Sequence, residues 1–81
     1  MWSEGTIGTN VFSEDKPSKI FHYWVKHFEE GSKFGIDGGR ISKLMLKLNG
    51  KIVVNYDRGW DIKPENEEAE TAYMILLERY N

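Results

Sequence analysis

The stretch ISKLMLKLNGKIVVNY, residues 41–56, decides the fold of this chain of 81 residues. Within Ile41–Leu48, leucine alternates with lysine or methionine, and this period of two is typical of a β-strand with one buried face. Asn49-Gly50 is a strong signal for a tight turn, and Lys51–Tyr56 continues as a second strand. The stretch therefore predicts an antiparallel hairpin.

Burial selects the register of this hairpin, because a shift of one residue exchanges the two faces of a strand. A two-residue turn would place Val53 and Asn55 opposite leucines and would set a polar side chain among buried ones. We therefore predict a three-residue turn, Leu48-Asn49-Gly50, with Gly50 in the left-handed conformation as a bulge. The predicted pairs are Leu46 with Ile52, Leu44 with Val54 and Ser42 with Tyr56. The inner face would hold Leu44, Leu46, Ile52, Val54 and Tyr56, and the outer face Lys43, Lys47, Lys51 and Asn55.

Four segments precede the hairpin. Trp2–Thr9 alternates weakly and predicts a strand, and Asn10–Lys19 is a polar loop that contains Pro17. Ile20–Phe28 is rich in aromatic and β-branched residues and predicts another strand, whereas Gly31–Arg40 holds four of the eight glycines and predicts a structured loop. The more apolar side of the second strand, which we place inward, is Phe21, Tyr23, Val25 and His27. The opposite side is Ile20, His22, Trp24, Lys26 and Phe28.

The period changes to that of a helix after the hairpin. Pro64 suits the first turn of a helix, and the glutamates within residues 65–70 favour its positive N-terminal end. The apolar stripe comprises Ala69, Ala72, Tyr73, Leu76 and Tyr80, widened by Ile75 and Leu77. Such a stripe must be buried against another layer. The predicted fold class is therefore α+β: one domain, residues 1–81, with an antiparallel sheet of about four strands in a meander and one C-terminal helix packed on one face.

Composition limits the classes of protein that this chain can belong to. The absence of cysteine excludes disulfides, thiol catalysis and Cys-ligated zinc, and it favours a reducing compartment. The N-terminal residues do not resemble a signal peptide, and the longest apolar run, Ala72–Leu77, is far shorter than the roughly 20 residues of a membrane span. We expect a cytoplasmic protein with no membrane partner.

The net charge of −2 conceals an uneven distribution. Residues 16–58 hold nine Lys/Arg and four Asp/Glu, a balance of +5. Residues 1–15 carry −3 and residues 59–81 carry −4. A basic middle section thus lies between two acidic ends, which bears on the kind of partner the domain can attract.

The sequence contains no recognisable catalytic, cofactor or metal motif. Gly31–Arg40 matches neither the P-loop nor the dinucleotide-binding spacing, and it favours a tight connection with positive φ at Gly38 or Gly39. His22 and His27 lie an odd number of positions apart on a predicted strand, so they point to opposite faces and cannot share a metal. We expect no cofactor, no metal site and no enzymatic activity.

Charged side chains next to the hairpin form a candidate polar loop cluster. Its members are Asp37, Arg40, Asp57, Arg58 and Asp61. They can converge at one end of the sheet, since Arg40 precedes the third strand and Asp57 ends the fourth. We favour Arg–carboxylate pairs that fasten two loops. A small hydrolase built on the three aspartates is an alternative, but no nucleophile–base pair accompanies them.

The helix-free side of the predicted sheet is the main candidate binding surface. Its expected residues are Trp24, Lys26, Phe28, Lys43, Met45, Lys47, Lys51 and Val53. Lysines with aromatic rings suit single-stranded nucleic acid, which such a face binds by stacking and phosphate attraction. They equally suit a solvated sheet face, a protein interface or a homodimer interface. Among the binding functions we favour a protein partner or self-association over nucleic acid.

Three motifs carry a family resemblance. They are GIDGGRISKL at Gly35–Leu44, NYDRGWD at Asn55–Asp61, and the Trp-x-x-Gly-Thr pattern of residues 2–6. In these motifs the chain resembles a family of small uncharacterised proteins from Gram-positive bacteria and their phages. The resemblance covers most of the chain and implies a bacterial or phage origin. It implies no activity and no site residues, because the family has no assigned function.

Overall fold

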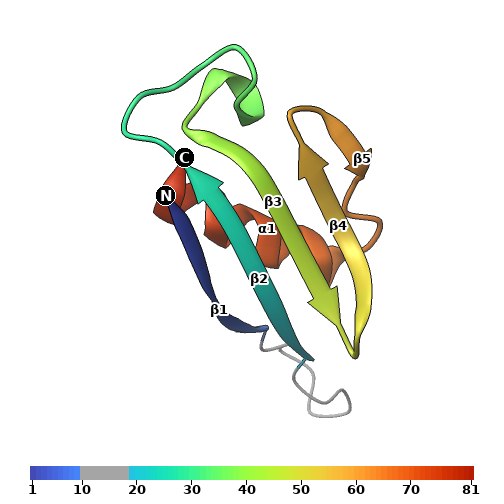
Figure 1. Ribbon diagram of the computed structural model, residues 1–81. Coiled ribbons are helices and arrows are strands. Elements are labelled where there is room, and N and C mark those ends of the chain that lie inside the picture. Colours follow the sequence, from blue (N-terminus) through green and yellow to red (C-terminus); the bar gives the residue numbers. More distant parts are fainter. Residues whose placement is uncertain (10–18) are drawn as a thin grey trace.

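The structure is a two-layer α+β fold, in which one helix covers one face of an antiparallel sheet (Figure 1). The computed structural model describes residues 1–9 and 19–81. Its elements are β1 (Trp2–Thr9), β2 (Lys19–His27), the short 3₁₀ helix η1 (Ile36–Gly38), β3 (Ile41–Leu48), β4 (Lys51–Asp57), β5 (Trp60–Ile62) and α1 (Glu67–Tyr80). The strands lie side by side in chain order, which confirms the predicted meander. Apart from Lys19, the polar loop predicted at Asn10–Lys19 lies outside the described residues.

The sheet has five strands where the sequence predicts about four. The additional strand, β5, has only three residues, too few to show a period of two. It folds back on β4 so that Trp60 pairs with Tyr56, and the Asp57 amide donates to the carbonyl oxygen of Gly59 at 2.9 Å. In the turn, Arg58 adopts a φ of 57°, a conformation rare for residues other than glycine.

The predicted three-residue turn between β3 and β4 is wrong, although most of the predicted inner face is right. Asn49 and Gly50 form a two-residue turn with φ values of 53° and 80°, the pattern of a type I′ turn, and Leu48 pairs with Lys51. The extra residue lies further along β4, because the register shifts so that Val53 has no partner. The observed pairs are therefore Leu46 with Val54 and Leu44 with Tyr56.

This displaced bulge changes which residues of β4 face the core. Val54 and Tyr56 are buried as predicted, whereas Ile52 pairs with Lys47 on the helix-free face and is 36% exposed. Val53 packs against the core instead. Lys51 lies opposite Leu48, on the helix side of the hairpin end.

The predicted orientation of the second strand is confirmed. Phe21, Tyr23 and Val25 are buried in the core. His27 lies on the same side but is only partly buried. Its ring lies beside that of Tyr80, with the two centroids 4.9 Å apart. The sheet and helix thus enclose one continuous core.

Helix α1 begins at Glu67, three residues later than the position of Pro64 led us to expect. Asn66 is its N-cap, and its side-chain oxygen accepts a hydrogen bond from the Ala69 amide at 2.8 Å. Pro64 therefore precedes the helix rather than occupying its first turn. Ala69, Ala72 and Leu76 are fully buried, as the predicted stripe requires.

The glycine-rich segment forms the structured loop that the sequence predicts. Gly38 has a φ of 72°, so it is Gly38 and not Gly39 that takes the left-handed conformation. Gly35 lies so close to Gly39 that an added Cβ would overlap the Gly39 carbonyl oxygen. Asn81 closes the loop: its side chain accepts from the Ile41 amide and donates to the Ile36 carbonyl, each at 3.0 Å.

Candidate functional site

The face of the sheet opposite α1 is the candidate site, and we call it the outer face. No described helix covers it, because α1 packs on the other side of β1–β4 (Figure 1). Cross-strand pairing defines its residues, since directly opposed residues point to the same side. They are Trp2, Glu4, Thr6, Gly8, Ile20, His22, Trp24, Lys26, Lys43, Met45, Lys47, Ile52, Asn55 and Asp57.

Aromatic rings and lysine ammonium groups alternate across the outer face. His22 stacks on Trp24 with ring centroids 4.5 Å apart, and the Lys47 ammonium lies 5.5 Å from the Trp24 centroid. The Lys26 ammonium lies 5.9 Å from the Trp2 ring and 5.6 Å from the Phe28 ring, just beyond the end of β2. These distances are typical of cation–π contacts. The rings therefore lie beside cations at the surface, and none of them belongs to the buried core.

Two hollows cross the outer face and share Lys43. The larger, of about 460 Å³, is lined by Trp2, Trp24, Lys43, Leu44, Met45, Lys47, Asn55, Tyr56 and Asp57. The smaller, of about 250 Å³, is lined by Lys26, Phe28, Ser32, Phe34, Ser42, Lys43 and Arg58. Together they bring an aromatic, cationic lining from β1, β2, β3, β4 and the glycine-rich loop onto one side of the molecule.

The balance of charge on this side is positive. Its cations are Lys26, Lys43, Lys47 and Arg58, and its carboxylates are Glu4 and Asp57. The Asp57 carboxylate lies 3.7 Å from the Lys43 ammonium. A pair this exposed contributes little to stability and can exchange partners. The ammonium groups are thus available to an anionic ligand.

The structure brings together most of the predicted binding surface. Trp24, Lys26, Phe28, Lys43, Met45 and Lys47 all lie on or beside the outer face. Lys51 and Val53 do not, because the bulge in β4 turns both toward the helix side. Sequence reasoning missed Trp2 and Ile52. The weak alternation of Trp2–Thr9 gave no orientation for Trp2, and the bulge that exposes Ile52 has no sequence signature.

The predicted polar loop cluster does not assemble. Asp57 pairs with Lys43, and Asp61 accepts a hydrogen bond from the Asn55 side chain at 3.1 Å. Asp37 lies on the helix side, where its charge adds to burial in raising the pKa of Tyr73 to about 12. Within the described residues, no ion pair joins Arg40 or Arg58 to any of the three aspartates. The predicted Arg–carboxylate fastening is therefore wrong.

The two histidines lie on opposite faces, as predicted. His22 stacks on Trp24 and contacts Glu4 at 3.2 Å, whereas the Nε2 atom of His27 lies 3.0 Å from the Ser3 hydroxyl. Burial lowers the pKa of His27, and the N-terminal ammonium and Arg40 lower it further. In the parts of the chain that the structure describes, no group of three or more His, Asp or Glu side chains is arranged to hold a metal.

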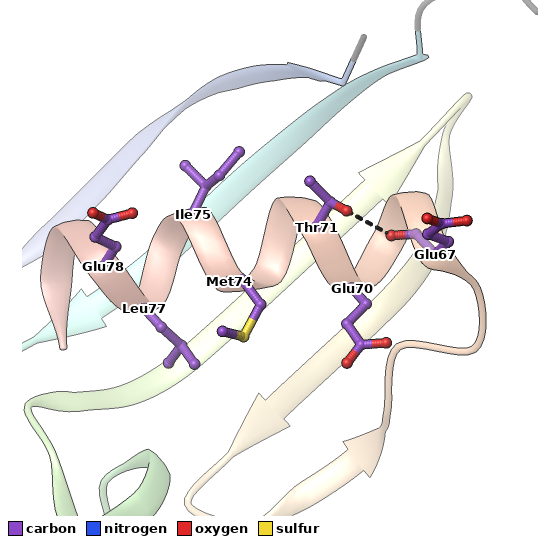
Figure 2. Close-up of a pocket in the computed structure, with 7 residues that line it drawn as sticks. All are labelled: Glu67, Glu70, Thr71, Met74, Ile75, Leu77 and Glu78. Atoms are coloured by element: carbon purple, nitrogen blue, oxygen red, sulfur yellow. Dashed lines mark hydrogen bonds between the residues drawn. The ribbon is translucent and has the colours of Figure 1, made fainter. Parts of the chain in front are cut away.

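A further hollow, of about 730 Å³, lies along the exposed side of α1 and is not a cleft. Every residue that lines it belongs to α1, and Figure 2 shows these side chains spreading from the helix. The one hydrogen bond drawn there joins the Thr71 hydroxyl to the Glu67 carbonyl at 2.9 Å, within the helix itself. Glu67, Glu70 and Glu78 make this surface acidic. This side of α1 is therefore acidic, whereas cations outnumber carboxylates on the outer face.

None of the described helices is both long enough and apolar enough to span a membrane. In comparisons with known proteins, one family matches residues 1–81, and its description is "Domain of unknown function (DUF7678)". No curated protein and no solved structure matches the chain. The function must therefore be argued from the geometry of the outer face.

Proposed function

The chain belongs to the DUF7678 family, a domain of unknown function, and from that premise we propose that it is a non-enzymatic module that binds an anionic partner on its outer face. The observation that carries the proposal is the groove of about 460 Å³ on this face, with lysines and aromatic rings in its lining. Lysine ammonium groups attract anions, and exposed aromatic rings offer contact area at little entropic cost.

The separation of charge between the two layers supports an anionic partner. Lys26, Lys43 and Lys47 lie on the outer face, whereas α1 presents glutamates on the other side. A negatively charged partner is attracted to the first surface and repelled by the second, so the field of the whole domain orients its approach. The net charge of −2 does not oppose this, because cations outnumber carboxylates on the outer face while glutamates gather on the exposed side of α1.

The same charges disfavour a homodimer formed by two outer faces. A two-fold interface places identical patches against each other. Lys43 and Lys47 lie near the middle of the face, so such a dimer would bring lysines of both copies into one interface, and like charges brought together cost free energy. An acidic partner thus fits the surface better than a second copy does.

An NMR titration tests the proposal with defined polyanions. Poly-L-glutamate, heparin and a short single-stranded oligonucleotide are added in turn at low ionic strength, where surface charges are least screened. We expect amide chemical-shift changes to cluster on β2 and β3 of the outer face and to spare α1. The double variant Lys43→Glu/Lys47→Glu should abolish them, whereas Lys63→Glu, outside both hollows, should not. If no polyanion shifts any outer-face resonance, the proposal is wrong.

We also infer that the domain acts in the cytoplasm of a bacterium or in a bacterial cell infected by a phage. The lack of cysteine among all 81 residues supports a reducing compartment. The resemblance of Gly35–Leu44 and Asn55–Asp61 to proteins of Gram-positive bacteria and their phages supports the origin. Fractionation of a native host, followed by detection of the protein in the soluble or the membrane fraction, tests the location.

A further inference from the structure

We propose that the anionic partner is a single strand of nucleic acid, whose bases stack on the outer-face rings while its phosphates meet the lysines. This inference rests on the proposed binding function and makes it specific. A single strand presents planar rings and negative charges along one chain, and it is the alternation of the two that the outer face complements. An acidic peptide offers the charges without regularly spaced rings.

Exposed aromatic rings beside cations are the first observation that favours a single strand. Trp2 is 57% exposed and Phe28 47% exposed, and both lie next to the Lys26 ammonium. Large rings left this open on one surface, each beside a cation, are the parts from which single-strand binding surfaces are built. Lys26 can turn from the rings to a phosphate without moving the backbone, since its contacts to Trp2 and Phe28 are side-chain contacts only.

The arrangement of the cations along one line is the second observation that favours a single strand. Lys47 and Lys43 line the larger hollow, and Lys43, Lys26 and Arg58 line the smaller one. Because the hollows share Lys43, the four cations follow one track across the face. Along β2 the track runs from Trp24 to Phe28, a distance of about 13 Å at the usual rise of a strand. A chain of phosphates can follow such a track, whereas a duplex presents its bases edge-on and buried.

Arg58 supports the same reading. Its φ of 57° is uncommon for a residue other than glycine. This φ belongs to the tight turn between β4 and β5, where the Arg58 amide donates to the Ser42 carbonyl oxygen at 3.0 Å. Its guanidinium forms no ion pair with the described residues. The Arg58 side chain lines the hollow that also contains Lys26 and Phe28, so an unpaired cation is added to the track.

The positions of the three tryptophans make the test direct. Trp2 and Trp24 line the larger hollow. Trp60 packs between Tyr56 and Tyr73, away from the outer face, with distances between ring centroids of 5.1 Å and 5.3 Å. The variant Trp60→Phe therefore reports on the outer face alone. Stacked bases quench tryptophan, so oligo(dT) and oligo(U) of about ten nucleotides should quench its fluorescence. The double variant Trp2→Phe/Trp24→Phe, which retains Trp60, should show no quenching.

Salt dependence and matched variants complete the experiment. If three or four phosphates are neutralised, log Kobs should fall with log[salt] with a slope of about −2 to −3. Trp2→Ala, at an exposed site, should weaken binding at least about fivefold while the circular dichroism spectrum stays native. Lys63→Ala should bind as the wild type does. The oligo(dT) and oligo(U) arms distinguish DNA from RNA as the source of the strand.

The outcomes separate this inference from the proposed function. Binding of single strands that is lost with Trp2→Ala and weaker for a duplex of equal length supports the inference. Binding that is equal for duplex and single strand and unaffected by Trp2→Ala overturns it. So does binding of poly-L-glutamate without binding of either oligonucleotide, which leaves the broader proposal intact. Binding of none of these polyanions overturns both.

Discussion

Asn81 shows how much one side chain can determine at the residue scale. Its amide group satisfies the Ile41 amide and the Ile36 carbonyl and thereby connects the end of α1 to both η1 and β3. The same side chain occupies the space that a Cβ at Gly39 would need. The glycine-rich loop is therefore shaped by close packing, and it needs no ligand to explain its composition.

Replacement of Asn81 tests this role. Asn81→Ala leaves two partly buried backbone groups without partners, so we expect the free energy of unfolding to fall by about 1–3 kcal/mol. Urea denaturation monitored by circular dichroism measures the change. Asn81→Asp keeps the acceptor for Ile41 but loses the donor to Ile36. Its free energy of unfolding should lie between those of the wild type and Asn81→Ala. A wild-type midpoint for Asn81→Ala would show that the bridge contributes nothing.

His27 predicts a pH dependence of stability. Partial burial lowers its pKa below 6.5 in the folded domain, and repulsion from the N-terminal ammonium and Arg40 lowers it further. The unfolded chain then binds this proton at a higher pH than the folded chain does. Stability is therefore lost as the pH falls through 6.5 toward the lower, folded-state pKa.

The variant His27→Gln isolates this effect. It cannot take up the proton, so the difference in unfolding free energy between wild type and variant should shrink as the pH falls from about 8 to about 5. Urea titrations at several pH values give the two curves. A difference that stays constant over this range would contradict the assignment.

At the scale of elements, the β3–β4 hairpin combines a type I′ turn with a bulge at Val53. The turn needs positive φ at both central residues. The bulge then restores the alternation that brings Val54 and Tyr56 onto the core face. The predicted three-residue turn also put Val54 and Tyr56 on the core face, because it placed the extra residue at Gly50 instead of Val53.

Two alanine substitutions separate the turn from its surroundings. Gly50 has a φ of 80° and nothing within 4 Å of an added Cβ, whereas Gly59 has equal space and no positive φ. Gly50→Ala should therefore cost about 1–2 kcal/mol, and Gly59→Ala should be neutral or slightly stabilising. Thermal unfolding of both variants measures this. Equal effects would mean that backbone strain is not what Gly50 relieves.

The contact between α1 and the sheet depends on small residues. Ala69 and Ala72 are fully buried, and they let the helix axis approach the strands. Ala72→Leu should overpack this contact and lower the free energy of unfolding by about 1–3 kcal/mol. Thr71→Leu, on the exposed side of the helix, serves as the control. Denaturant midpoints compare the two, and a stable Ala72→Leu variant would indicate a looser layer contact.

At the scale of the whole molecule, the described residues form a five-stranded meander and one α-helix, and among them two sheet edges and one sheet face have no covering element. β2, β3 and β4 have neighbours on both sides, whereas β1 and β5 have one neighbour each. Local opening is easiest where backbone hydrogen bonds are exposed and packing is thin.

Hydrogen exchange should therefore follow the order of the strands. We expect the slowest amides in β2 and β3, and faster exchange in β5, which has three residues and lies at an edge. Native-state exchange followed by NMR gives the protection of each amide. Protection of β5 equal to that of β3 would show that the sheet opens only as one unit.

Charge is also organised at this scale. The acidic N-terminal region, the basic middle and the acidic C-terminal region are visible in the sequence as a linear pattern. Folding converts the pattern into two surfaces, because β2 and β3 turn their lysines to the outer face and α1 carries its glutamates on the other layer. The proposed binding of an anionic strand is a consequence of that conversion.

The sequence by itself determined the fold class, the inner faces of β2 and β3 and the buried stripe of α1. Each follows from local periodicity, since a period of two or of about 3.6 residues assigns every side chain to a side. The same reasoning brought Trp24, Lys26, Lys43 and Lys47 onto one candidate surface.

Tertiary structure alone decided the site of the extra residue in β4, the existence of β5 and the separation of the predicted polar cluster. A bulge can lie at the turn or within the strand and satisfy the same alternation. Asn49 and Gly50 form the two-residue type I′ turn, so the extra residue lies at Val53. The choice turned Ile52 outward and Val53 inward. Strand pairing was also needed to place Trp2 beside Lys26 and so to complete the outer face. Residues so distant in the chain share no local pattern.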